Sequence, residues 1–322
     1  MEVGLIDVDS HNFPNLVLMK ISAYHKDKGD NVEWCIRLKH YDVVYVSKVF
    51  GSEYSQEDGF AINADRVFYG GTGYAIKVVD GKEIYEKSND ENLPPEIEHI
   101  YPDYSLYPEL TKNRAFGFLT RGCPNGCPFC IVSQKEGRVS RKVADLSEWW
   151  NGQGNIELMD ANILACKDHE ELLMQLADSG AKINFNQGLD ARFINEKNIE
   201  ILQDVKISTI HFAWDCIAHS ERILKGLKLA KEKLNVNSRN FIVYVLTNYE
   251  TSIEEDMYRV NKLRELDISP DIRIYRKNAL PKRHILRDLQ RWCNNRFIYR
   301  SCEFADYVPR ADGKSIRDLY WN

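Results

Sequence analysis

The sequence predicts an α/β protein built on parallel sheets, and two observations indicate this fold class. Across residues 113–278, an apolar run, a polar loop and a helical pattern recur six times. Near the start of the chain, residues 3–36 have the order strand, helix, strand. Strands that alternate with helices form parallel sheets. Six consecutive units would curl such a sheet into a barrel or part of one, with a smaller parallel-sheet domain before it.

Charge divides the chain in the same place. Residues 1–112 hold 11 Lys and Arg against 20 Asp and Glu, a net charge of −9, and residues 113–322 hold 32 against 28, a net charge of +4. A chain of 322 residues is long enough for two domains with cores of their own. We therefore expect a first domain with its linker over 1–112, a core over 113–280 and a basic helical extension over 281–322.

The composition indicates an ordinary globular protein. Hydrophobic residues make up 43% and charged residues 28% of the chain. No apolar run approaches the length of a membrane span, and the first ten residues do not resemble a signal peptide. Eight cysteines, three of them clustered, suit a reducing compartment better than a disulfide framework. The expected location is the cytoplasm, with no membrane partner.

The first domain reads as a small doubly wound sheet of the flavodoxin or Rossmann type. The Asp9-Ser10-His11 tripeptide directly follows the first strand, where the crevice of such a sheet binds ligands, and a glycine-rich stretch at 70–73 follows a later strand. Four prolines without periodicity indicate a linker over 89–108. The predicted strands are 3–8, 32–36, 43–49 and 66–69, with a helix over 15–24.

The core repeats six strand and helix units, fewer than a complete eight-unit barrel requires. In barrels of this kind, the chemistry lies at the carboxyl ends of the strands. Side chains at those ends are therefore candidates for a site, although each could simply cap a helix. The predicted strands are 115–120, 156–160, 182–185, 209–214, 241–247 and 271–275.

Three cysteines follow the first of these strands at spacings of four and three residues. Cys123, Cys127 and Cys130 alternate with glycine and proline in the stretch RGCPNGCPFC, which breaks any helix and lets three thiolates converge. A 4Fe-4S cluster normally takes four cysteines, so three would leave one iron open to a substrate or cofactor. Two other readings are a redox pair formed by Cys127 and Cys130, and structural zinc with a distant histidine.

The loop resembles the signature of the radical S-adenosylmethionine (radical SAM) superfamily, with Phe129 directly before the last cysteine. The resemblance implies a partial (β/α)6 barrel of TIM type in which the three cysteines bind a 4Fe-4S cluster. It also implies that S-adenosylmethionine binds the open iron and is cleaved by one-electron reduction to a 5'-deoxyadenosyl radical. That radical abstracts hydrogen from a substrate, which the sequence does not identify. An electron donor such as flavodoxin or ferredoxin is the implied partner.

The same resemblance assigns the strand-end residues to S-adenosylmethionine. It places Phe129 beside the adenine and Asp160 and Asn162, in the stretch MDAN, near the amino group. Arg192 falls where related proteins place an arginine near the cofactor carboxylate. The other strand-end candidates are Gln187 on the third strand, Asp215 on the fourth and Asn248 on the fifth.

The first domain resembles, more loosely, the cobalamin-binding domain that precedes the core in one branch of the superfamily. Asp9 and His11 are similar to the start of a D-x-H-x-x-G motif whose histidine ligates cobalt, but Pro14 stands in place of the glycine. The segment is also short for such a domain. A histidine satisfied in a surface turn is the commoner outcome, so cobalamin is kept only as an alternative cofactor.

The C-terminal part is basic and aromatic. Residues 273–300 contain nine Lys and Arg and one acid, and Pro281 is expected to open a helix with Arg283, Arg287 and Arg291 along one face. Such a surface could bind RNA. A solvated helix packed on the barrel is the preferred interpretation, because a pI near 6.0 lacks the usual basic footprint. A zinc-structured RNA-binding module without catalysis is the alternative function for the chain.

Overall fold

The computed structural model describes residues 1–51, 54–55, 61–79, 82–90 and 92–321. The chain divides into two compact units, Met1–Met159 and Asp160–Asn322. Both contain parallel sheets, so the predicted α/β class is confirmed. None of the helices in these described ranges is long and apolar enough to cross a bilayer.

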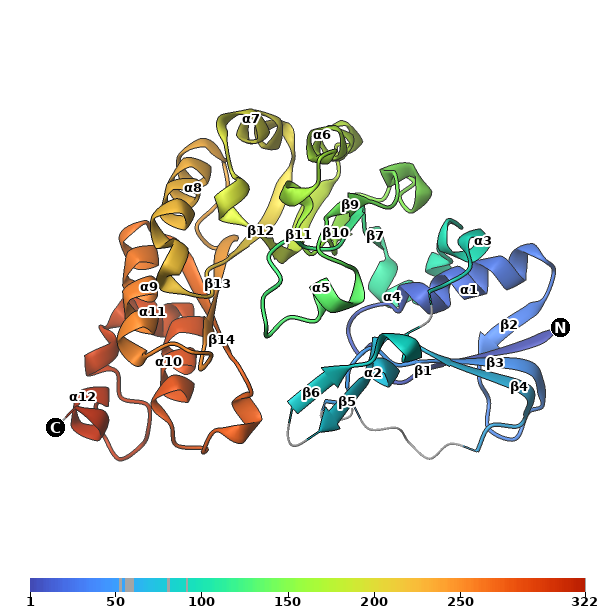
Figure 1. Ribbon diagram of the computed structural model, residues 1–322, viewed down its shortest axis with the longest axis horizontal. Coiled ribbons are helices and arrows are strands. Elements are labelled where there is room, and N and C mark those ends of the chain that lie inside the picture. The colour runs from blue at the N-terminus through green and yellow to red at the C-terminus, as the bar shows by residue number, and fades with distance from the viewer. Residues whose placement is uncertain (52–53, 56–60, 80–81, 91, 322) are drawn as a thin grey trace. The chain divides into compact units, whose positions relative to one another are not determined.

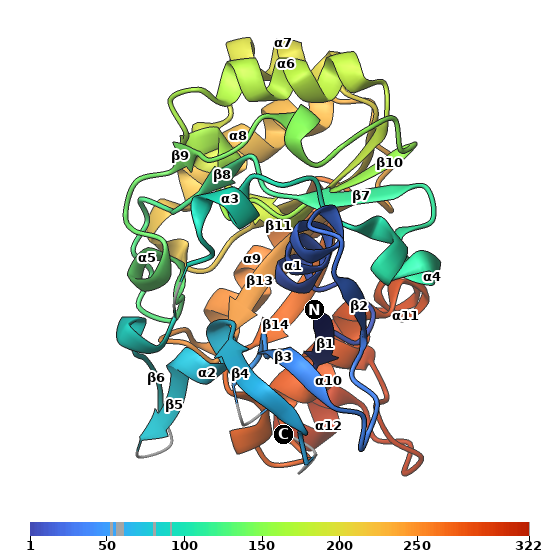
Figure 2. The same cartoon turned by 90° about the vertical axis from the view of Figure 1, so that its right-hand side faces the viewer.

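The first unit begins with a four-stranded parallel sheet in the order β2-β1-β3-β4. It contains β1 (Glu2–Asp7), β2 (Asn31–Trp34), β3 (Tyr41–Ser47) and β4 (Ala64–Gly70). Helix α1 (Leu16–Asp27) links β1 to β2 and lies on one face of the sheet (Figures 1 and 2). The Asn15 side chain caps it by accepting a bond from the Leu18 amide at 3.2 Å. Leu18 and Ile21 then pack on Val3 and Leu5, which buries the apolar face of the helix.

The stretch predicted as a linker is partly structured in its described residues, which exclude residue 91. Prolines occupy the first turns of α3 (Pro95–Glu98) and α4 (Pro108–Thr111), where a missing amide hydrogen leaves no helical bond unmade. Between these helices, the hydroxyl of Tyr104 donates to the carbonyl of Trp149 at 2.6 Å. The prolines therefore start helices here, and the tyrosines pack them onto the unit. Between β4 and this stretch, the chain forms α2 (Thr72–Ala75), β5 (Ile76–Val79) and β6 (Lys82–Tyr85).

Two of the predicted core strands belong to the first unit, and four belong to the second. In the first unit, β7 (Arg114–Gly117) pairs in parallel with β10 (Asn155–Leu158). In the second unit, the parallel order is β14-β13-β12-β11. These strands are β11 (Lys182–Leu189), β12 (Ile207–Ala213), β13 (Phe241–Thr247) and β14 (Ser269–Ile274). All six predicted strand positions are confirmed, although β7 ends three residues before its predicted end and β11 runs four residues beyond its own.

Helices cover one face of the second unit's strands (Figure 1). The helices are α6 (His169–Ser179), α7 (Glu196–Asp204), α8 (Ser220–Lys233) and α9 (Ile253–Glu265). Three short helices complete the unit, α10 (Ile285–Asn294), α11 (Arg296–Ser301) and α12 (Ile316–Tyr320). Helix α10 starts four residues after Pro281, because His284 caps it by accepting a bond from the Leu286 amide at 3.2 Å.

Candidate functional site

The three-cysteine loop is closed at its base by a two-stranded ribbon. Strand β8 (Thr120–Arg121) directly precedes the loop and pairs antiparallel with β9 (Arg141–Lys142). Gly122 has a φ of +93°, and a Cβ there would come within 2.2 Å of the Val139 carbonyl oxygen. Only glycine fits this position, so the turn into the loop depends on it.

Glu136 fastens the two sides of the loop together. Its carboxylate accepts from Arg121 Nη1 at 2.7 Å and from the Gly122 amide at 3.0 Å. Its carbonyl accepts from Arg141 Nη1 at 2.7 Å. The guanidinium of Arg121 also lies over the ring of Phe118, 3.6 Å from its centroid. One carboxylate therefore holds both the backbone before Cys123 and the strand that precedes it.

The donor atoms of the loop suit an iron-sulfur cluster in type and number. Cys123, Cys127 and Cys130 are all partly exposed, and none is in a disulfide. The Cys130 amide donates to the Cys127 carbonyl at 3.0 Å, which forms a tight turn between two thiols. Phe129 is partly buried inside that turn. Among the residues that the structure describes, no three His, Cys, Asp or Glu side chains are gathered closely enough to hold a metal ion.

The glycine-rich stretch after β4 contacts the short helix that follows the cysteines. Lys135, in α5 (Val132–Lys135), donates to the hydroxyl of Thr72. Burial lowers the pKa of Lys135, and Asp90, 3.9 Å away, opposes this shift. A Cβ on Gly73 would lie 2.3 Å from the Phe50 carbonyl oxygen, so this glycine permits a close backbone approach. Two motifs far apart in the sequence thus support each other.

The second unit contains the strand-end candidates. Asp160 and Asn162 follow β10 and are buried at 5% and 2% exposure. Gln187 is exposed within β11. Asn248 follows β13 with a φ of +65°, a left-handed conformation that asparagine tolerates. Its side-chain amide donates to the Tyr275 carbonyl at 2.8 Å, which fixes its orientation.

Arg192 is held by a neighbouring acid. Its Nε and Nη2 donate to the two carboxylate oxygens of Asp190 at 2.8 and 2.6 Å. This forked geometry fixes the guanidinium plane. Asp215 lies close enough that both Asp190 and Arg192 influence its pKa. The structure therefore groups Arg192 and Asp215, and it adds Asp190, whose pairing the sequence alone did not indicate.

The pKa of Asp215 is strongly raised. Burial raises its pKa to about 6, Asp190 adds to the rise, and the guanidinium groups of Arg259 and Arg192 oppose it. Arg259 is fully buried in α9 and donates to the carbonyls of Trp214 at 2.6 Å and Leu246 at 2.8 Å. It thereby joins the ends of β12 and β13, next to Asp215 in the chain. No sequence signal identified it, because charged residues on a helix usually face solvent.

Asp215→Asn is expected to change how stability depends on pH. An aspartate with a raised pKa binds its proton more tightly in the folded protein, so its contribution is fully present below pH 3.8 and is lost as pH rises through about 6. In the variant, the free energy of unfolding should no longer fall as pH rises through this range. At pH 8 it should exceed the wild-type value by on the order of 2 kcal/mol. Urea unfolding at several pH values from 4.5 to 8 measures it. The control is Asp204→Asn, which changes an exposed acid in the same unit and should keep the wild-type dependence of unfolding free energy on pH. If Asp215→Asn also kept the wild-type pH dependence, the raised pKa of Asp215 would be contradicted.

Polar side chains alternate with buried apolar ones along the second unit's strands. His211 on β12 stacks on Tyr244 of β13, with ring centroids 4.9 Å apart, and Arg273 of β14 lies 4.6 Å from the Tyr244 centroid. His211 Nδ1 is 2.8 Å from the Phe185 carbonyl, so this nitrogen carries the proton. Val243 and Val245, on either side of Tyr244 in β13, are fully buried. Only the strand ends were candidates in the sequence, so His211, Tyr244 and Arg273 were missed.

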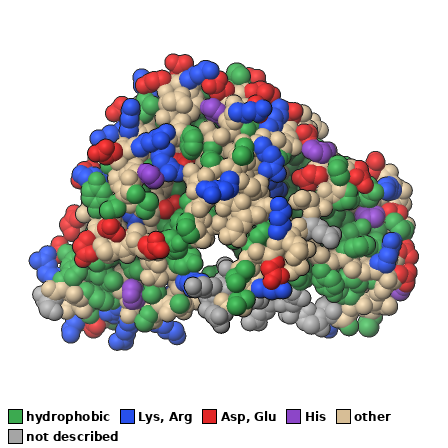
Figure 3. All heavy atoms as spheres, viewed as in Figure 1, with side chains coloured by type: hydrophobic (Ala, Val, Ile, Leu, Met, Phe, Trp, Pro, Cys, Tyr) green, Lys and Arg blue, Asp and Glu red, His purple; other side chains and the backbone are tan. Residues whose placement is uncertain are grey.

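The basic C-terminal stretch is largely engaged with the protein itself. Arg287 Nη2 donates to the Lys277 carbonyl at 2.6 Å, and Arg291 Nη1 donates to the Pro309 carbonyl at 2.9 Å. Arg300 pairs with Asp267 at 3.0 Å. On the face shown in Figure 3, basic and acidic side chains are interspersed. These contacts favour the packing role that the sequence suggested, while RNA binding stays an untested prediction.

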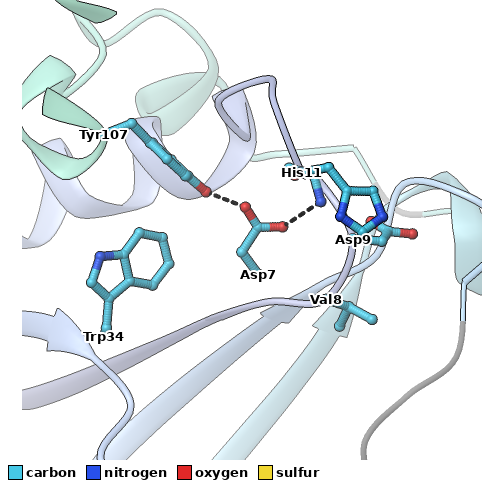
Figure 4. Close-up of a pocket in the computed structure, with 7 residues that line it drawn as sticks. Asp7, Val8, Asp9, His11, Trp34 and Tyr107 are labelled. Carbon is cyan, nitrogen blue, oxygen red and sulfur yellow. Dashed lines mark hydrogen bonds between the residues drawn. The ribbon is translucent and has the colours of Figure 1, made fainter. Parts of the chain in front are cut away.

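The loop after β1 forms a pocket in the first unit (Figure 4). The pocket has a volume of about 290 Å³ and lies at the carboxyl ends of β1 and β2. His11 is exposed there with a φ of +42°. The predicted ligand crevice thus coincides with a pocket. Its volume is at the lower end of the range for drug-sized ligands, which does not favour a corrin.

Comparison with known proteins gives weak similarities only. No protein-family model and no curated protein matches the chain. Crystal structures of Streptococcus suis SuiB are similar, with a TM-score of 0.42 and 15% identity for SuiB bound to S-adenosylmethionine, covering 58% of this chain and 48% of that one. SuiB itself has a TM-score of 0.39 and 13% identity, covering 67% of this chain and 55% of that one. SuiB bound to the precursor peptide SuiA has a TM-score of 0.37 and 13% identity, covering 65% of this chain and 52% of that one. The chain spans about half the length of these proteins, and similarity at this level identifies neither family nor activity.

Proposed function

We propose that this chain is a radical SAM enzyme with a partial (β/α)6 barrel. The observation that carries the proposal is the loop of Cys123, Cys127 and Cys130. Glycine turns shape this loop and Glu136 fastens it, and it follows β8, shortly after strand β7 of the parallel sheet. These three thiolates would hold a 4Fe-4S cluster. When bound, the reduced cluster supplies the electron that cleaves S-adenosylmethionine and so starts hydrogen abstraction from the substrate. The protein's own part is to hold, orient and shield the reactants.

The second unit's strand-end residues would serve S-adenosylmethionine. Asp160 and Asp215 are carboxylates suited to an amino group, and Arg192, fixed by Asp190, offers a donor plane suited to a carboxylate. Asn162, Gln187 and Asn248 supply amides, and Phe129 supplies an aromatic face for adenine. His211, Tyr244 and Arg273 add polar groups that could position a substrate. Flavodoxin or ferredoxin as electron donor and a cytoplasmic location stay predictions.

Metal analysis of protein purified without oxygen separates this proposal from its alternative. A brown preparation with about four iron and four sulfide per chain is expected for the cluster. A colourless preparation with one zinc per chain would instead favour the zinc-structured RNA-binding module. The assay needs no substrate, so an unidentified substrate does not obscure the result.

Glu136→Ala is expected to weaken cluster binding while all three cysteines remain. Loss of the carboxylate frees Arg121 and the Gly122 amide, so the loop no longer holds its thiols in place. Partners that orient metal ligands typically contribute 10- to 100-fold in affinity, and we expect iron loss to a chelator to be at least about 10-fold faster. Glu109→Ala, an exposed acid in the same unit, is the control. Equal rates of iron loss in both variants would remove Glu136 from this role.

A further inference from the structure

The pocket at the end of β1 is lined by acidic and aromatic side chains that the proposed chemistry does not use. Asp7, the last residue of β1, accepts from the Tyr107 hydroxyl at 2.5 Å and from the Ser10 amide at 3.1 Å. Trp34, the last residue of β2, forms one wall and meets the Tyr107 ring edge-on at 5.2 Å. Figure 4 shows Asp7 between Tyr107 and His11, with Trp34 beside them. The open edge of a parallel sheet at its carboxyl ends is where ligands bind in such folds.

The two acids of the pocket have different roles. Asp9 is buried, and its two oxygens accept the amides of Val49 and Phe50 at 2.8 Å each, so it anchors the neighbouring loop. Asp7 accepts one amide and one hydroxyl, and a carboxylate has about four acceptor positions. Asp7 therefore keeps acceptor capacity toward the pocket that it lines.

Within the described ranges of the chain, no Lys, Arg or His nitrogen forms an ion pair with Asp7 or Asp9, although the His11 side chain also lines the pocket. Partly buried charges are normally paired, because removal from water penalises them. The whole segment 1–112 has a net charge of −9, which adds to the field. In addition, the Ser10 hydroxyl is buried with 9% residue exposure and has no hydrogen-bond partner in the described structure, although Ser10 lines the pocket.

We propose that this pocket binds a small organic cation, whose charged nitrogen pairs with Asp7 and whose stem packs against Trp34. A carboxylate beside an indole face is the combination that recognises an ammonium or guanidinium group. The volume of about 290 Å³ suits a compact ligand.

The test uses n-pentylamine as the cationic probe and 1-pentanol as its neutral counterpart, each titrated into the whole 322-residue chain under reducing conditions. The indole N–H signal of Trp34 in a two-dimensional NMR spectrum, assigned by its loss in Trp34→Phe, reports binding. We expect saturable shifts with the amine and none with the alcohol, inorganic phosphate or Mg²⁺. Asp7→Asn keeps an oxygen for the Ser10 amide and an amide group for the Tyr107 hydroxyl. It should weaken binding of the amine about 10-fold or more, because it removes a charge-assisted hydrogen bond.

Matched variants keep the result specific to the pocket. Trp34→Ala, followed by saturation-transfer signals of the amine, should weaken binding about three- to tenfold. Asp65→Asn and Trp321→Ala, which change exposed residues elsewhere, should leave the affinity as in wild type. Equal binding of pentanol or phosphate, binding of Mg²⁺ in place of the amine, or an affinity unchanged by Asp7→Asn would each overturn the proposal. So would the absence of saturable amine binding to the folded wild type.

Discussion

Alanine at any one of Cys123, Cys127 and Cys130 is expected to reduce cluster iron to a small fraction of the wild-type content. A 4Fe-4S cluster held by only three protein thiolates has no spare ligand, so each cysteine is necessary. The measurement is iron and acid-labile sulfide per chain after anaerobic reconstitution, together with the visible absorbance of the cluster.

Two comparisons make this result decisive. Cys216→Ala removes an exposed thiol outside the loop and should bind iron as wild type does. A dithiol oxidoreductase would depend on Cys127 and Cys130 and would tolerate the loss of Cys123. Full iron content in Cys123→Ala would therefore contradict the three-cysteine assignment.

Arg259→Met is expected to lower the free energy of unfolding by about 3–5 kcal/mol, the range for breaking a buried ion pair. The change leaves Asp256, at 1% side-chain exposure, without its cation. It also removes the donors for the carbonyls of Trp214 and Leu246, so two strand ends lose their shared partner. Denaturant unfolding monitored by circular dichroism measures the change.

Lys262→Met provides the comparison on the same helix. Lys262 pairs with Glu265 at 2.7 Å, but both side chains are exposed, so its loss should change stability by less than about 1 kcal/mol. If Arg259→Met were as mild as Lys262→Met, the buried guanidinium would not be what joins β12 and β13.

Most strands could be predicted because their cores are apolar runs bounded by turn residues. The run at 241–247 coincides with β13, and the run at 3–8 lies within one residue of β1. Boundaries failed where a tertiary contact decided them. Strand β11 continues through Gly188, which has a φ of +89° and lies beside the Tyr244 ring. Helix α10 begins after the His284 cap and not at Pro281. Neither contact is visible in the local sequence.

The candidate site also has one part that the sequence predicts and another that depends on tertiary contacts. Spacing and residue type point to the cysteine loop, because thiolates between glycines and prolines have a chemical meaning without any tertiary structure. The roles of Asp190, Arg259 and Glu136 depend on which distant atoms they meet. Glu136 accepts a hydrogen bond from the amide of Gly122, fourteen residues earlier in the chain. Arg259 donates to the carbonyl of Trp214, forty-five residues earlier. The assignment of individual strand-end residues to S-adenosylmethionine stays a prediction.

The most direct test of the central claim is reductive cleavage of S-adenosylmethionine. Wild type and Cys127→Ala would be reconstituted anaerobically with iron and sulfide, then incubated with dithionite and S-adenosylmethionine, and 5'-deoxyadenosine would be quantified by chromatography. The proposed function predicts 5'-deoxyadenosine from wild type and none from Cys127→Ala. Folded wild-type protein that takes up no iron under these conditions, or equal product from both proteins, would contradict it.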